Sequence, residues 1–133
     1  MGAEGSCQIG GNVFVTNVEA RIKAAVPHAR VVMHGHIGDG NIHVIALIDR
    51  ARCQDRAATA ALVAEINEIV DDETAAQGGA ISAEHGIGIT NCGRLARVTD
   101  PLDIELIRDI KRLLDPNGLI NSGKIFSAGG ARR

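Results

Sequence analysis

Two β-strand patterns on either side of a glycine-rich turn constrain the fold of this chain more than any other feature. Residues 29–34 (ARVVMH) have the β-branched content of a strand, and residues 41–48 (NIHVIALI) form an apolar run that is typical of a buried strand. Between them lies GHIGDG, and Gly-Asp-Gly-Asn is a good hairpin connection. The sequence therefore predicts paired antiparallel strands in residues 29–48.

Helical and further strand patterns surround these strands. Apolar residues recur at helical spacing in residues 17–25 and 52–77, where Asn17 can cap the first helix. Residues 12–16 and 80–83 have the composition of short strands. The order strand, helix, strand, strand, helix, strand predicts an α+β fold of the ferredoxin-like, split βαβ type.

The remainder of the chain is predicted to form a glycine-rich loop and one more helix. The loop covers residues 86–93, and residues 101–114 carry leucine and isoleucine on one side of a helix that begins with proline. The chain of 133 residues has the size of one domain. Residues 12–126 are expected to form it, between a flexible segment at 1–11 and a flexible tail at 127–133.

Composition argues against a nucleic-acid partner. The formal charge is −2 with neutral histidines, so no basic surface is expected for a phosphate backbone or an anionic membrane. Aromatic residues make up 2% of the chain, which leaves few rings on which bases could stack. The three cysteines form no CxxC pair, and neither a signal peptide nor an apolar run of about 18 residues is present. A cytoplasmic protein without membrane association is expected.

Four of the five histidines fall in two short glycine-rich segments, residues 34–43 (HGHIGDGNIH) and residues 82–88 (SAEHGIG). Residues two apart on an extended backbone share a face, so His34 and His36 are expected to point the same way, with His43 returning after the turn. Imidazole nitrogens and a carboxylate are suitable ligands for a divalent transition metal.

The dipeptide Glu84-His85 supplies a carboxylate and a further imidazole. If it is extended, its side chains point to opposite faces, so one can ligate a metal while the other acts as a base. Either segment alone is better explained as a turn with surface histidines, whereas the two together favour a site. Asp39 is interpreted as a turn residue, and Asn41 stays open between a turn residue and a substrate contact.

Three segments carry a resemblance to a known family: GHIGDGNIH (residues 35–43), ISAEHGIG (81–88) and IKRLLDPNGLINSGKI (110–125). In order and spacing they resemble the C-terminal region of FAD-linked oxidases of the vanillyl-alcohol oxidase type. That group includes D-lactate dehydrogenase, D-2-hydroxyglutarate dehydrogenase and the glycolate oxidase flavin subunit.

The resemblance implies a substrate-binding cap region that works with an FAD-binding domain. By position, it implies that His36, His43 and Glu84 bind a divalent metal, zinc or manganese, and that His85 is the catalytic base. Asn41 is taken as a substrate-binding residue. A small 2-hydroxy acid is the expected substrate, and FAD is expected to be bound by a domain or subunit outside these 133 residues, so the isolated chain is expected to be inactive.

Two alternatives stay open. A stand-alone metal-dependent hydrolase could use the same ligands with His85 activating water, and an inactive metal-binding or regulatory module would need no catalysis. Apolar surface that is normally covered by neighbouring domains also predicts association, with the FAD-binding domain or subunit or with a second copy of the chain.

Overall fold

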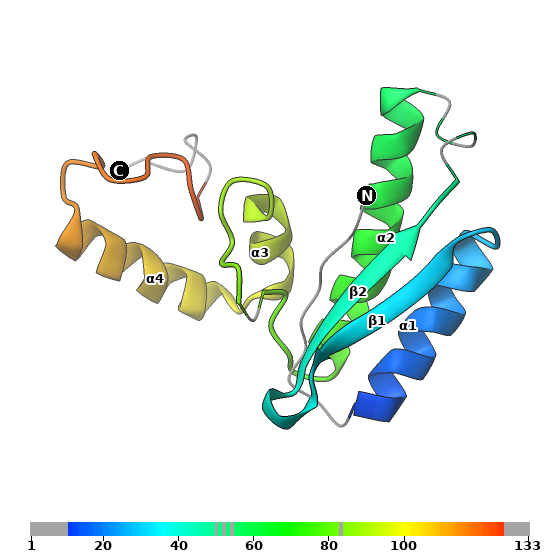
Figure 1. Cartoon of the computed structure of the whole chain (residues 1–133). Helices are drawn as coiled ribbons and strands as arrows, with labels where there is room; N and C mark the ends of the chain where they lie inside the picture. The colour runs from blue at the N-terminus through cyan, green and yellow to red at the C-terminus, as the bar shows by residue number, and fades with distance from the viewer. Residues whose placement is uncertain (1–10, 50, 52, 54, 83, 127–133) are drawn as a thin grey trace. The chain divides into compact units, whose positions relative to one another are not determined.

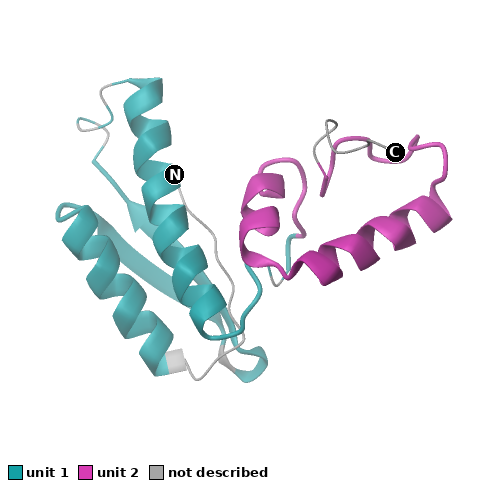
Figure 2. Cartoon of the chain, turned by 180° about the vertical axis from the view of Figure 1, so that it is seen from behind, with its two compact units in different colours: residues 1–85 teal, residues 86–133 magenta. Residues whose placement is uncertain are grey.

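The structure is a computed structural model that describes residues 11–49, 51, 53, 55–82 and 84–126. The chain forms two compact units, residues 1–85 and residues 86–133 (Figure 2). The segments expected to be flexible, 1–11 and 127–133, lie almost entirely outside the described residues. The single domain expected over residues 12–126 stays a prediction.

The first unit contains two helices and a β-hairpin (Figure 1). Its order is α1 (Gly11–Ala25), β1 (Arg30–His36), a short 3₁₀ turn η1 (Ile37–Asp39), β2 (Asn41–Leu47) and α2 (Arg56–Ala76). The views in Figures 1 and 2, from opposite sides, show both helices on one face of the hairpin. The α+β class is therefore confirmed.

The hairpin itself has the predicted arrangement. β1 and β2 pair antiparallel without a bulge, from Arg30 opposite Leu47 to His36 opposite Asn41. Because side chains alternate along each strand, one face of the hairpin joins the core shared with α1 and α2. The core-facing strand residues are Val31, Met33, Ile42, Val44 and Ala46.

The strand predicted at residues 12–16 is wrong, because these residues belong to α1. Phe14, Val18 and Ile22 follow one another at intervals of four residues and are fully buried, so a helix buries all three on one side. Asn17, predicted to cap the helix, lies inside it. Its amide donates a hydrogen bond of 2.9 Å to Oε1 of Glu73 on α2.

The strand predicted at residues 80–83 is also not formed by the described part of that segment, residues 80–82. α2 ends at Ala76, and Gly78 takes a positive φ of 69° that turns the chain away from the helix. Ile81 is buried at 3% exposure without strand pairing. Its apolar character therefore reflects burial, and the ferredoxin-like strand order is not confirmed.

The second unit contains α3 (Cys92–Val98) and α4 (Pro101–Leu114). α3 begins within the predicted loop at 86–93 and was not expected. α4 has the predicted bounds: Pro101 occupies its first turn, and the Asp100 carboxylate accepts a hydrogen bond of 2.8 Å from the N–H of Leu102.

One side of α4 is apolar and exposed. Its residues, called here the apolar face of α4, are between 49% and 81% exposed: Leu102, Leu106, Ile110 and Leu113.

Across the described residues, no helix is long and apolar enough to cross a membrane. The cytoplasmic location stays a prediction.

Asp115 closes the turn that follows α4. Its carboxylate accepts hydrogen bonds from Nζ of Lys111 and from the N–H groups of Leu119 and Ile120, both at 2.9 Å. These donors, and the Lys111 ammonium most strongly, hold the pKa of Asp115 below its ordinary value, although burial opposes the shift.

Candidate functional site

The hairpin face that the helices leave uncovered carries the polar residues of both strands. The register places His34 directly opposite His43, and His36 directly opposite Asn41. All four therefore lie on one face, and the turn through η1 returns the chain in the way that the sequence predicted.

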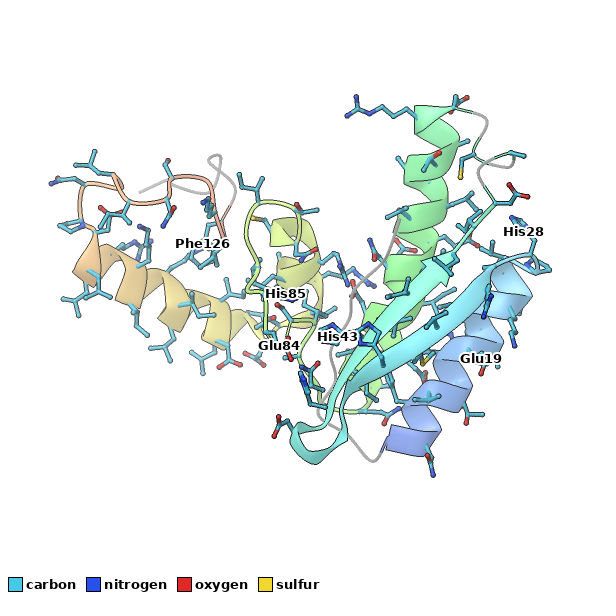
Figure 3. All side chains as sticks on the ribbon, viewed as in Figure 1. Glu19, His28, His43, Glu84, His85 and Phe126 are labelled. Atoms are coloured by element: carbon cyan, nitrogen blue, oxygen red, sulfur yellow. The ribbon has the colours of Figure 1, made fainter. Side chains whose placement is uncertain are left out.

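Glu84 reaches this face from the segment that follows α2 (Figure 3). Its Oε1 lies 2.8 Å from Nδ1 of His36, the distance of a hydrogen bond that the ring donates when Nδ1 carries the proton. The same oxygen accepts a hydrogen bond from Nδ2 of Asn41. One carboxylate oxygen thus joins two neighbouring positions of the hairpin.

The second oxygen of Glu84 faces two further imidazoles. Oε2 lies 3.6 Å from Nε2 of His43 and 3.9 Å from Nε2 of His85. The His43 side chain is 12% exposed, whereas that of His85 is 60% exposed. The two rings are tilted by 36° with their centroids 5.7 Å apart. A protected imidazole and an accessible one therefore share a single carboxylate.

Asn41 also holds a buried acceptor. The residue is 5% exposed, and Nδ2 donates to Glu84, but Oδ1 is buried and makes no hydrogen bond with the residues that the structure describes. An unpaired buried acceptor is costly, so such atoms call for a donor from outside the chain. The location next to Glu84 makes Oδ1 a candidate contact for a bound molecule.

The structure brings together all five residues that the sequence singled out: His36, Asn41, His43, Glu84 and His85. The expected opposite orientation of Glu84 and His85 is not observed, because the segment is a bend and both side chains reach the same place. Within the part of the chain that the structure describes, no three His, Cys, Asp or Glu side chains are spaced as a formed metal site.

Sequence reasoning noticed His34 but assigned it no role at the site. Its ring stacks on that of His43, with centroids 4.9 Å apart and an interplanar angle of 22°. The signal was available, since His34 lies two residues before His36 and therefore shares its face. The sequence pattern did not predict the register of the two strands, and the register decides which residue lies opposite His34.

Three further residues with polar or sulfur-containing side chains have other surroundings. Cys92 donates from Sγ to the carbonyl oxygen of Gly88 at 3.0 Å, a contact within the second unit. His28 is exposed and lies at the end of the hairpin away from Glu84 (Figure 3). Asp39 lies in the η1 turn as predicted.

Comparison with known proteins gives the chain a family. The family model described as "FAD linked oxidases, C-terminal domain" matches residues 12–125. D-2-hydroxyglutarate dehydrogenase of Stutzerimonas stutzeri (strain A1501) is 36% identical over 115 residues, which are 86% of this chain and 24% of that protein.

Two further relatives show the same pattern. The mitochondrial D-2-hydroxyglutarate dehydrogenase of Bos taurus is 34% identical over 113 residues, 85% of this chain and 19% of that protein. An uncharacterized FAD-linked oxidoreductase of Mycobacterium tuberculosis (strain CDC 1551 / Oshkosh) is 36% identical over 107 residues, 80% of this chain and 21% of that protein. The chain thus spans about a quarter or less of each of these relatives, and it belongs to the C-terminal domain family of FAD-linked oxidases.

Proposed function

We propose that this chain is the substrate-binding portion of an FAD-dependent dehydrogenase of small 2-hydroxy acids, of the D-lactate, glycolate or 2-hydroxyglutarate type. The observation that carries the proposal is the carboxylate of Glu84, which faces His36, Asn41, His43 and His85 on the uncovered face of the hairpin. Family membership and the names of the relatives support this reaction class.

We further propose that His36, His43 and Glu84 hold a divalent metal, zinc or manganese. Ligand atoms about 2.1 Å from one ion lie about 3.0–3.4 Å from one another. The distances from the Glu84 oxygens to Nδ1 of His36 and Nε2 of His43, 2.8 and 3.6 Å, bracket that range. The donors suit the ion, and small side-chain rotations would complete the set. A bound divalent cation supplies Lewis acidity, which lowers the pKa of a substrate hydroxyl.

The remaining residues of the site divide the work of binding and proton transfer. Asn41 offers the buried Oδ1 as an acceptor that orients the substrate. His85 is accessible and is proposed to accept the proton of the 2-hydroxyl at Nε2, as imidazole side chains often do in general base catalysis. FAD, bound by a separate domain or subunit, supplies the acceptor for the hydride that leaves C2, and the product is a 2-oxo acid.

Metal binding by the purified chain tests the ligand set. After removal of metal by a chelator, zinc and manganese are titrated back by calorimetry into the unmodified chain, Glu84→Gln and Glu19→Gln. Glu84→Gln keeps the size of the side chain but removes its charge, and we expect affinity to fall at least about tenfold. Glu19, a half-buried glutamate on α1 that pairs with Lys23 (Figure 3), is the matched control and is expected to leave metal affinity unchanged. Equal affinities in all three proteins would refute the ligand assignment.

Catalysis is tested with the FAD-binding domain or subunit present. Reduction of a dye by D-2-hydroxy acids is expected, and His85→Gln should lower kcat by about 10²–10⁴ while metal affinity stays within about twofold. Hydrolysis of esters or amides by the metal-loaded chain alone would favour the hydrolase instead. An intact, metal-loaded complex that oxidises no 2-hydroxy acid would refute the proposed reaction.

A further inference from the structure

We infer that His34 is a positioning residue, which fixes the imidazole plane of His43 by stacking on it. This inference rests on the proposed function, because it concerns how a proposed metal ligand is held. It assigns a role to a residue outside the set of His36, His43, Glu84, His85 and Asn41.

The hairpin register places the two rings side by side. His34 lies directly opposite His43, so their side chains emerge from neighbouring strands on the same face. Side chains in such pairs have Cβ atoms about 4.5–5.5 Å apart and regularly contact each other. The pairing cannot slip by one residue, because that would expose the core residues Val44 and Ala46, which are at most 2% exposed.

The two rings are stacked. The centroids of the two rings lie 4.9 Å apart, and their planes differ by only 22°. The His43 side chain is 12% exposed, whereas His34 is an exposed residue, so the outer ring of the pair covers the inner one. Rings at this separation attract each other through their faces.

Stacking limits the rotation of the His43 ring. The torsion that rotates an imidazole about its bond to Cβ is broad, so packing must set the ring plane. That plane determines whether Nε2 of His43 points toward Oε2 of Glu84, from which it lies 3.6 Å away. Hydrogen-bond partners that fix the orientation of a ligand imidazole affect metal affinity, and a stacked ring that fixes its plane is expected to do the same.

The same geometry argues against His34 as a ligand of the same ion. An imidazole binds a metal in the plane of its ring, and two nearly parallel rings have planes that do not meet near their nitrogens. A positioning role of His34 therefore explains its stack on His43, whereas a role of His34 as a third imidazole ligand does not.

The test compares His34→Phe, which keeps a planar ring without nitrogens, with His34→Ala, which removes the ring. Zinc affinity of the purified chain is measured by calorimetry. We expect His34→Ala to weaken binding about threefold to tenfold, the loss of one ring-stacking contact, and His34→Phe to stay within about twofold of the unmodified chain. His28→Ala, the removal of an exposed histidine elsewhere, serves as the matched control and should have no effect.

A metal-independent readout accompanies the titration. In the metal-free chain, nuclear Overhauser contacts between the His43 ring and the Glu84 side chain should be present in the unmodified protein and in His34→Phe, and lost in His34→Ala. If the unmodified chain binds no zinc, the proposed ligand set fails, while these contacts still decide the role of His34.

Two results would overturn the inference. If His34→Phe loses as much affinity as His34→Ala, the imidazole nitrogen is needed and His34 does not act by stacking. If His34→Ala keeps both the unmodified affinity and the contacts of the His43 ring, the stack has no positioning role.

Discussion

Replacing Gly35 with alanine should disrupt the hairpin at the level of the site. Gly35 lies opposite Ile42, between His34 and His36. A Cβ atom at this position would lie 2.0 Å from the carbonyl oxygen of Asn41 and 3.0 Å from Cα of Ile42. Both atoms belong to the backbone of β2, so no side-chain rotation can relieve the clash.

The size of the effect follows from the distance. Cβ contacts below 3.0 Å are essentially never observed, so β2 must move by at least about 1 Å relative to β1. Such a movement strains the hydrogen bonds between β1 and β2 on both sides of Gly35. We expect the free energy of unfolding to fall by about 3 kcal/mol, the upper range for overpacking. At about 4 °C per kcal/mol for a chain of this length, Tm should fall by about 12 °C.

Thermal unfolding followed by circular dichroism measures this loss, with Gly38→Ala as the control. A Cβ at Gly38 meets no atom within 4 Å, so that variant should stay within about 0.5 kcal/mol of the unmodified chain. Similar Tm values for Gly35→Ala and Gly38→Ala would show that β2 yields freely at Asn41 and would refute the reasoning.

Three further outcomes are expected. Phe14→Ala empties a fully buried position of α1 and should lower the free energy of unfolding, measured in urea, by about 3–5 kcal/mol. Val13→Ala, at the neighbouring residue that is 61% exposed, should lower it little, and equal losses in the two variants would contradict the observed core. The lowered pKa of Asp115 means that its carboxylate stabilises the fold above the ordinary aspartate pKa of about 4, and this contribution disappears as pH falls through the lower value in the folded state. The difference in free energy of unfolding between the unmodified chain and Asp115→Asn should therefore be constant above about pH 5 and shrink below about pH 4. A difference that grows on acidification would contradict a lowered pKa of Asp115. Leu106→Lys with Leu113→Lys should reduce self-association of the isolated chain in sedimentation experiments, and an unchanged mass would exclude the apolar face of α4 as the contact.

Local patterns predicted the hairpin and the last helix well. Turn chemistry and β-branched content are sufficient to locate β1 and β2, and an early proline followed by leucine and isoleucine on one side is sufficient to locate α4. The strand predicted at residues 12–16 failed because five residues are too few to distinguish alternation from a helical repeat. The helical repeat becomes visible only when Phe14 is read together with Val18 and Ile22.

The site was predicted as a set of residues, but its contacts were not. Clustering of histidine and glutamate in glycine-rich segments was enough to name Glu84 and His85 as neighbours of the hairpin histidines. The orientation of the two side chains depended on the backbone at residues 84 and 85, which form a bend instead of a strand. The partner of His34 depended on register, which joins residues nine positions apart and is fixed by packing.

Alternation along the hairpin has a consequence for insertions and deletions. A one-residue slip of β1 against β2 would turn His34 and His36 toward the helices and turn Val31 and Met33 toward solvent. The site and the part of the core that the hairpin supplies thus depend on the same alternation of side chains along the strands. Inserting or deleting a single residue in the turn would destroy both together. Such a change could therefore not remove the site while leaving the fold intact.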